Sequence, residues 1–97
     1  MLQFNQKDEI MVKIWAKVYS DDKIIKQYVF TKDCNIDYAD FLSYTTEICY
    51  NLDIPTPVVI KTHIFNYAKY NYVRFMPSDF VEELSFDKLV LENIEGR

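Results

Sequence analysis

The sequence predicts an α+β two-layer sandwich: an N-terminal β-hairpin, then one main helix, then mostly antiparallel strands. Residues 10–19 alternate apolar side chains with Lys, Trp and Tyr, which is typical of a strand with one buried face. Residues 24–31 are rich in β-branched and aromatic side chains and follow a short polar segment, so they form the return strand. Residues 37–52 carry apolar side chains at helical spacing. The expected element order is ββαβ(α)βαβ.

The hairpin register follows from a two-residue loop made of Asp21 and Asp22. This register pairs Val18 with Ile25 and Ile14 with Val29 on the inner face. On the outer face it pairs Trp15 with Tyr28, Lys17 with Lys26, and Lys13 with Phe30. Gly96, in the tail, is the only glycine of the chain, so Asn or Asp must supply any positive φ within the domain.

The main helix is expected over residues 37–52, with Asp37 as its N-cap. Its buried side is predicted from the apolar, aromatic or Thr side chains at positions 38, 41, 42, 45, 48, 49 and 52. The helix should stop at residues 53–57, because neither Pro55 nor Pro57 continues a helix comfortably.

The second half of the chain is predicted as short elements. Residues 58–60 are β-branched and are expected to form a central strand, while residues 63–71 fit either a strand or a turn or two of helix. Residues 72–75 read as a strand that ends before Pro77. A short helix is expected over residues 79–84, because Asp79 and Glu82 have the spacing of a capping box. Residues 86–94 are expected to form the last strand, and one possible place for this strand is the edge of the sheet.

The chain has 97 residues, which fit a single domain over residues 10–94. Residues 1–9 are expected to be a loose lead-in, and residues 95–97 a frayed end. There is no run of 18 apolar residues and no apolar segment typical of a secretory signal, so we expect a cytoplasmic protein without a membrane span. Cys34 and Cys49 are therefore expected to be reduced thiols. No motif calls for a metal or a cofactor.

Charge is distributed unevenly along the sequence. The net charge is −4, yet residues 10–32 sum to +3, residues 33–53 to −5, residues 54–77 to +3 and residues 78–97 to −4. In a two-layer fold this pattern predicts two sides of opposite sign. The alternatives are solvated faces with some ion pairs between elements, or an electrostatic dipole that orients a partner.

The first candidate interaction face is the outer side of the hairpin. Its members are Lys13, Trp15, Lys17, Tyr19, Lys26, Tyr28 and Phe30. Cations interleaved with aromatic rings suit the binding of single-stranded nucleic acid, because the rings can stack on unpaired bases. The same side chains could instead contact a protein, or pack inside the molecule under another segment. The negative net charge and the lack of a glycine-containing aromatic signature argue against nucleic acid.

The second candidate patch lies in the aromatic segment that follows the main helix. It consists of Tyr67, Lys69, Tyr70, Tyr72 and Arg74. Tyrosine is common at protein interfaces because it buries a large flat area and keeps a polar tip, although some of these rings must line the core. His63 is the only histidine, and it has no partner acid or nucleophile nearby in the sequence, so a structural role is favoured over catalysis or metal binding.

Two sequence segments resemble segments of a group of known proteins. They are Leu52-Asp53-Ile54-Pro55-Thr56-Pro57-Val58 and Arg74-Phe75-Met76-Pro77-Ser78-Asp79-Phe80-Val81-Glu82. With Val12-Lys13-Ile14-Trp15 they resemble small functionally uncharacterised proteins of anaerobic Gram-positive bacteria, over most of residues 11–94. The resemblance implies no activity, cofactor or site residue.

The sequence thus favours a small non-enzymatic protein-interaction module. Such a module could self-associate through an aromatic sheet face, for example as a homodimer. The alternatives are the binding of single-stranded nucleic acid by the hairpin face and a small enzyme that uses His63.

Overall fold

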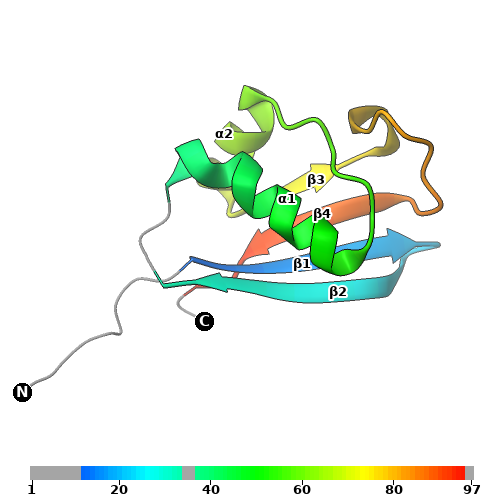
Figure 1. Ribbon diagram of the computed structural model, residues 1–97, viewed down its shortest axis with the longest axis horizontal. Coiled ribbons are helices and arrows are strands. Elements are labelled where there is room, and N and C mark those ends of the chain that lie inside the picture. Colours follow the sequence, from blue (N-terminus) through cyan, green and yellow to red (C-terminus); the bar gives the residue numbers. More distant parts are fainter. Residues whose placement is uncertain (1–11, 34–36, 96–97) are drawn as a thin grey trace, which may run out of the picture.

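The computed structural model describes residues 12–33 and 37–95, and it places a four-stranded antiparallel sheet against two helices (Figure 1). The strands are β1 (Val12–Ser20), β2 (Lys23–Lys32), β3 (Tyr72–Phe75) and β4 (Lys88–Asn93). The helices are α1 (Phe41–Leu52) and α2 (Lys61–Tyr70), with the 3-10 turns η1 (Tyr38–Asp40) and η2 (Pro77–Asp79). The sheet order is β2-β1-β4-β3. The predicted α+β two-layer sandwich is confirmed.

The hairpin turn forms at Asp21 and Asp22, as expected, and both residues have positive φ, at 54° and 64°. Two successive positive φ angles define the type I′ turn that suits a two-residue hairpin. The other positive φ angles among the described residues belong to Asp53 and Asn71, which end α1 and α2. The prediction that Asn and Asp serve where glycine is missing is therefore confirmed.

The predicted hairpin register is correct only beside the turn. Tyr19 pairs with Ile24, but the register shifts at Val18, which pairs with Lys26, so that Ile25 is the extra residue of a β-bulge. From there Trp15 pairs with Val29 and not with Tyr28. A one-residue shift moves every side chain of a strand to the other face. Contrary to expectation, the side chains of Lys26, Tyr28 and Phe30 therefore lie on the helix side of the sheet.

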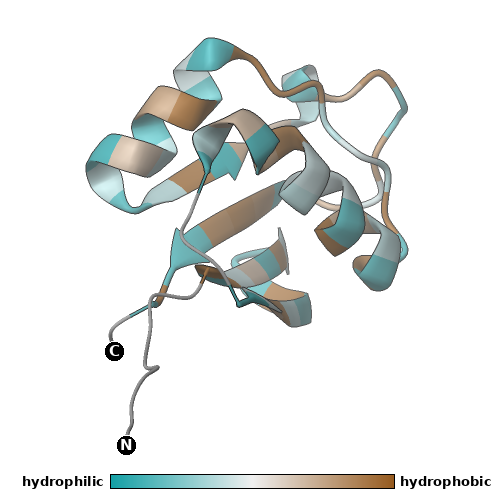
Figure 2. Cartoon of the chain, turned by 60° about the vertical axis from the view of Figure 1, so that its left-hand side comes forward, coloured by the Kyte–Doolittle hydropathy of each residue, from teal (hydrophilic) through white to brown (hydrophobic). Residues whose placement is uncertain are grey.

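The core lies between the sheet and the helices. Ile14, Ala16 and Val18 of β1 are fully buried there, as the alternation predicted. Hydrophilic and hydrophobic residues alternate along both helices, as expected of helices with one buried side (Figure 2). In α1 the buried positions include Phe41, Ile48, Cys49 and Leu52, but Tyr44 replaces the expected positions 38 and 42, which are exposed. The ring of Tyr44 lies 5.4 Å from that of Phe30, which the bulge in β2 places on the helix side of the sheet.

Two other expectations about the second half of the chain are wrong, and two open points are decided. Residues 58–60 are not a strand: the amide of Val58 donates to the carbonyl of Asp79, and Ile60 is the N-cap of α2. Residues 79–84 form no helix, because the Asp79 carboxylate accepts from the amide of Met76 (2.8 Å) and closes η2. The last strand, β4, lies between β1 and β3 and not at an edge. The ambiguous residues 63–71 are helical up to Tyr70.

Candidate functional site

The candidate site is the sheet face that the helices leave uncovered, called here the outer face. The antiparallel register fixes which side chains share it. Trp15, Glu92 and Tyr72 form one row across β1, β4 and β3, and Lys17, Val90 and Arg74 form the next row. Tyr19 and Lys88 are paired one step further along β1 and β4. The outward positions thus bring residues 15–19 beside residues 72–92.

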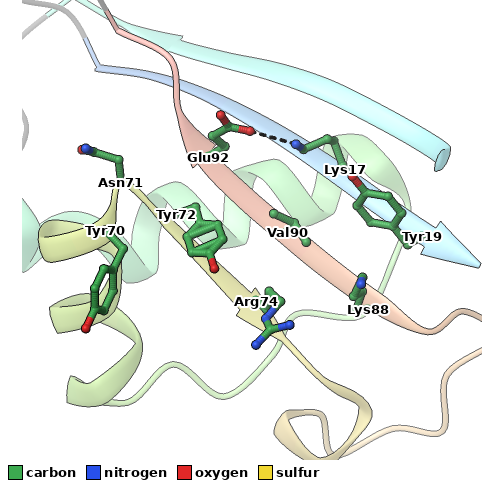
Figure 3. Close-up of a pocket in the computed structure, with 9 residues that line it drawn as sticks. All are labelled: Lys17, Tyr19, Tyr70, Asn71, Tyr72, Arg74, Lys88, Val90 and Glu92. Carbon is green, nitrogen blue, oxygen red and sulfur yellow. Dashed lines mark hydrogen bonds and ion pairs between the residues drawn. The ribbon is translucent and has the colours of Figure 1, made fainter. Parts of the chain in front are cut away.

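A pocket of about 560 Å³ opens on this face and is called the outer-face pocket (Figure 3). Its lining comes from three strands and the end of α2: Lys17, Tyr19, Tyr70, Asn71, Tyr72, Arg74, Lys88, Val90 and Glu92. Three of these side chains are cations and one is an acid. A pocket with apolar and tyrosine walls and a few charged groups can bind a ligand of opposite charge.

Lys17 is held in place by two neighbours. Its Nζ lies 2.8 Å from Oε1 of Glu92 and 4.2 Å from the centre of the Trp15 ring. Its side chain is only 11% exposed. The Trp15 indole in turn donates to the amide oxygen of Gln27 (3.0 Å). The charge of Lys17 is therefore compensated within the protein, and the Trp15 ring already has a cation on its face.

Arg74 and Lys88 are the two cations of the pocket that form no ion pair within residues 12–33 and 37–95. Neither has an acidic partner among the described residues, although Lys88 lies 5.1 Å from the centre of the Tyr19 ring. Arg74 is exposed on β3, and Lys88 is half-buried on β4. Because Lys17 and Glu92 balance each other, these two side chains give the pocket its positive charge.

The opposite side of the molecule carries the other sign along α1. Residues 37–60 include Asp37, Asp40, Glu47 and Asp53 and contain no Lys or Arg. This segment includes α1, which covers the inner face of the sheet (Figure 1). The α1 part of the helix layer is thus acidic, whereas α2 carries Lys61 and Lys69 and no acid.

The first candidate face is divided by the β2 bulge. Trp15, Lys17 and Tyr19 lie on the outer face with Lys13, which is exposed outside the pocket. Lys26, however, lies on the inner side, where its Nζ donates to the carbonyls of Leu52 (2.9 Å) and Asp53 (3.5 Å) at the end of α1.

The remaining two members of that face contribute to packing. Phe30 is buried in the core, and Tyr28 is partly buried against it. The ring–ring pairs among the described residues all join core positions, such as Phe30 with Tyr44. For Tyr28 and Phe30, the internal-packing alternative is correct.

The second candidate patch is divided as well. Tyr67 is 1% exposed and packs on Phe41 at 4.9 Å, so it is a core residue, and burial raises the pKa of its hydroxyl. Lys69 is exposed on α2, with its Nζ 5.4 Å from the centre of the Tyr70 ring. Tyr70, Tyr72 and Arg74 line the outer-face pocket. The structure therefore joins half of each candidate patch into one site.

Sequence reasoning missed Asn71, Lys88, Val90 and Glu92. Residues 88, 90 and 92 alternate with Leu89 and Leu91 of the core, so a period-two signal was present, although Val90 is itself only 7% exposed. It did not reveal that β4 is central and pairs with both β1 and β3.

His63 has a structural environment. Its Nδ1 accepts from the amide of Ile60 (3.0 Å), its Nε2 lies 3.4 Å from Oδ1 of Asp79, and its ring stacks on Phe75 at 4.6 Å. The side chain is buried beside a smaller pocket of about 310 Å³ that Ser78 also lines. Both ring nitrogens face structural partners, so neither is directed at a substrate or at Ser78.

The described part of the chain offers little for other types of site. No cluster of three or more His, Cys, Asp or Glu side chains is placed to hold a metal ion there. None of the described helices is both long and apolar enough to cross a membrane. Cys49 is a buried free thiol whose pKa burial raises to about 11, and Cys34 lies outside the described residues.

Comparison of the chain with protein-family models, curated proteins and solved structures finds no significant match. The geometry of the outer face therefore carries the functional argument.

Proposed function

We propose that this protein is a small non-enzymatic protein-interaction module, and that its outer face binds an acidic protein surface carrying aromatic or apolar side chains. One observation carries the proposal: Arg74 and Lys88 have no acidic partner among the described residues, and they flank a pocket whose walls include Tyr72 and Val90. An acidic partner supplies the missing charges, and its apolar side chains fill the pocket.

The arrangement supports a protein partner over single-stranded nucleic acid. Base stacking needs a free ring face, but the Trp15 ring has Lys17 above it. Phosphates also avoid carboxylates, and Glu92 lies on β4, between β1 and β3, on this face. Nucleic acid remains the alternative that the experiment below separates.

An enzyme that uses His63 is supported less. A general base needs a nitrogen within reach of a substrate proton. Here Nδ1 accepts from the Ile60 amide and Nε2 faces the Asp79 carboxylate.

The proposal is tested by titration of the full chain while the fluorescence of Trp15 is followed. Trp15 is the only tryptophan, and it lies beside the pocket. The probes are a random glutamate–tyrosine copolymer, polyglutamate and a short oligothymidylate, each at low and high salt. We expect the copolymer to bind most tightly, and added salt to weaken it.

Two matched double variants complete the test. Arg74→Glu with Lys88→Glu should weaken copolymer binding about tenfold or more, since two attractive charges become repulsive. Lys23→Glu with Lys61→Glu makes the same change of charge at exposed residues outside the pocket and should bind like wild type. Equal binding by the two variants would overturn the proposal, and tightest binding by oligothymidylate would replace it with nucleic acid.

A further inference from the structure

The outward side of α1 is a second unpartnered surface, called here the α1 face. Leu42 is 55% exposed and Tyr50 is 83% exposed. With Thr46 they follow one another at i, i+4 and i+8, so they form a single stripe along the helix. A depression of about 700 Å³ along this stripe is lined in part by Asp40 and Glu47. The α1 face is thus apolar and acidic.

We propose that the α1 face of one copy of this protein binds the outer-face pocket of the next copy. This inference rests on the proposed function and names its partner as the chain itself. The charges are complementary: Asp40 and Glu47 are acids in a segment without Lys or Arg, and Arg74 and Lys88 are the pocket cations that form no ion pair in the described part of the chain. The apolar groups also match, since Leu42 and Tyr50 would lie on the exposed rings of Tyr70 and Tyr72.

The spacing of the charges fits this docking. Asp40 and Glu47 are seven residues apart, which is about 10 Å along a helix axis. Arg74 is paired with Val90, and Lys88 is two residues further along β4. One strand spacing combined with two residues of rise places the Cα atoms of Arg74 and Lys88 about 8 Å apart. A single helix can therefore bring both acids near both cations, as in other recognition of a helix by a groove.

The geometry makes the contact heterologous. The α1 face and the outer face lie on opposite layers of the sandwich (Figure 1), so a copy bound through one still offers the other. Such contacts build open chains or rings and not a closed two-fold dimer. A two-fold dimer through the outer face would instead place Arg74 and Lys88 against the same cations of the partner, which like-charge repulsion opposes.

The test uses two full-length variants that each lose one face. The sheet variant is Arg74→Glu with Lys88→Glu, and the helix variant is Glu47→Gln with Tyr50→Ser. The control for the helix variant is Val81→Ser with Glu82→Gln, which changes an equally exposed apolar residue (Val81, 88% exposed) and its acidic neighbour outside both faces. Circular dichroism verifies that each variant is folded, and sedimentation velocity at low salt measures the species.

We expect the wild type and the control to form a concentration-dependent series of species, and each face variant alone to associate at least about tenfold more weakly. An equimolar mixture of the two variants should give a 1:1 complex and nothing larger, because one intact outer face meets one intact α1 face. A helix variant that associates like wild type, a wild type that stops at a dimer, or a wild type that stays monomeric overturns the inference. The copolymer titration still decides the proposed function in each of these cases.

Discussion

Lys17 and Glu92 are 75 residues apart in the sequence, yet their side chains form a 2.8 Å ion pair that joins β1 to β4 on the outer face. The pair is largely shielded from water, with side-chain exposures of 11% and 19%. It compensates one cation of the face and leaves Arg74 and Lys88 available to a partner. The same pair also stabilises the centre of the sheet.

We therefore expect Glu92→Gln to destabilise the fold by about 1–3 kcal/mol, because it leaves the charge of Lys17 without its partner in a shielded position. The double change Lys17→Met with Glu92→Gln should recover part of this loss. Urea unfolding of the two variants measures the difference. If the double variant is less stable than the single variant, the pair does not act as described.

The hairpin turn is expected to gain stability from glycine. Asp22 has φ of 64°, a conformation that is less costly for glycine than for other residues. Asp22→Gly should therefore stabilise the protein by about 0.5–1 kcal/mol, and Asp22→Val should destabilise it. Thermal unfolding of both variants measures these shifts. A lower melting temperature for the glycine variant would contradict the type I′ turn.

His63 is expected to stabilise the fold by holding the start of α2. His63→Ala removes the acceptor for the Ile60 amide and should cost about 1–2 kcal/mol more than His63→Asn, whose side-chain oxygen can occupy the Nδ1 position. His63→Gln, which places a polar atom nearer the Nε2 position, should fall between them. Denaturant unfolding of the three variants ranks them. Equal losses for Ala and Asn would show that this hydrogen bond adds nothing.

Stability is expected to fall in alkaline solution, partly through Cys49. Burial raises the pKa of the Cys49 thiol from 9.0 to about 11, so the native state binds the proton more tightly than the unfolded state. This contribution is fully present below pH 9 and is lost as the pH rises from about 9 to 11. Tyr67, whose pKa burial also raises, adds to the fall above pH 10.

The measurement is the free energy of unfolding against pH for wild type and Cys49→Ala. The variant should be less stable at neutral pH, because it leaves a cavity, but its stability should fall less steeply between pH 9 and 11. Identical slopes for the two proteins would contradict the assignment to Cys49.

Much of the fold follows from local pattern. The alternation in residues 10–19 correctly predicts the inner face of β1. The lack of glycine correctly predicts that Asn or Asp supplies positive φ, which the structure shows at Asp21, Asp22, Asp53 and Asn71. These features depend on neighbours in the sequence, so the sequence alone was sufficient.

The parts that could not be predicted depend on single residues or on distant partners. One extra residue, Ile25, moves Phe30 from the outer face to the core, and no composition signal marks a bulge. The candidate site also needs β4 beside β1, a pairing between residues far apart in the chain. Members of the two predicted patches lie together on one face only because of the sheet order.

The central claim, that the outer face binds an acidic protein surface supplied by α1, is tested most directly by a dilution series followed by nuclear magnetic resonance of backbone amides. As the full chain is concentrated at low salt, we expect amide shifts to move at residues 15–19, 72–74 and 88–92 on the outer face, and at residues 40–50 on α1. Shifts confined to the outer face would indicate a two-fold contact, and shifts centred on the β2 edge, or none at all, would contradict the account.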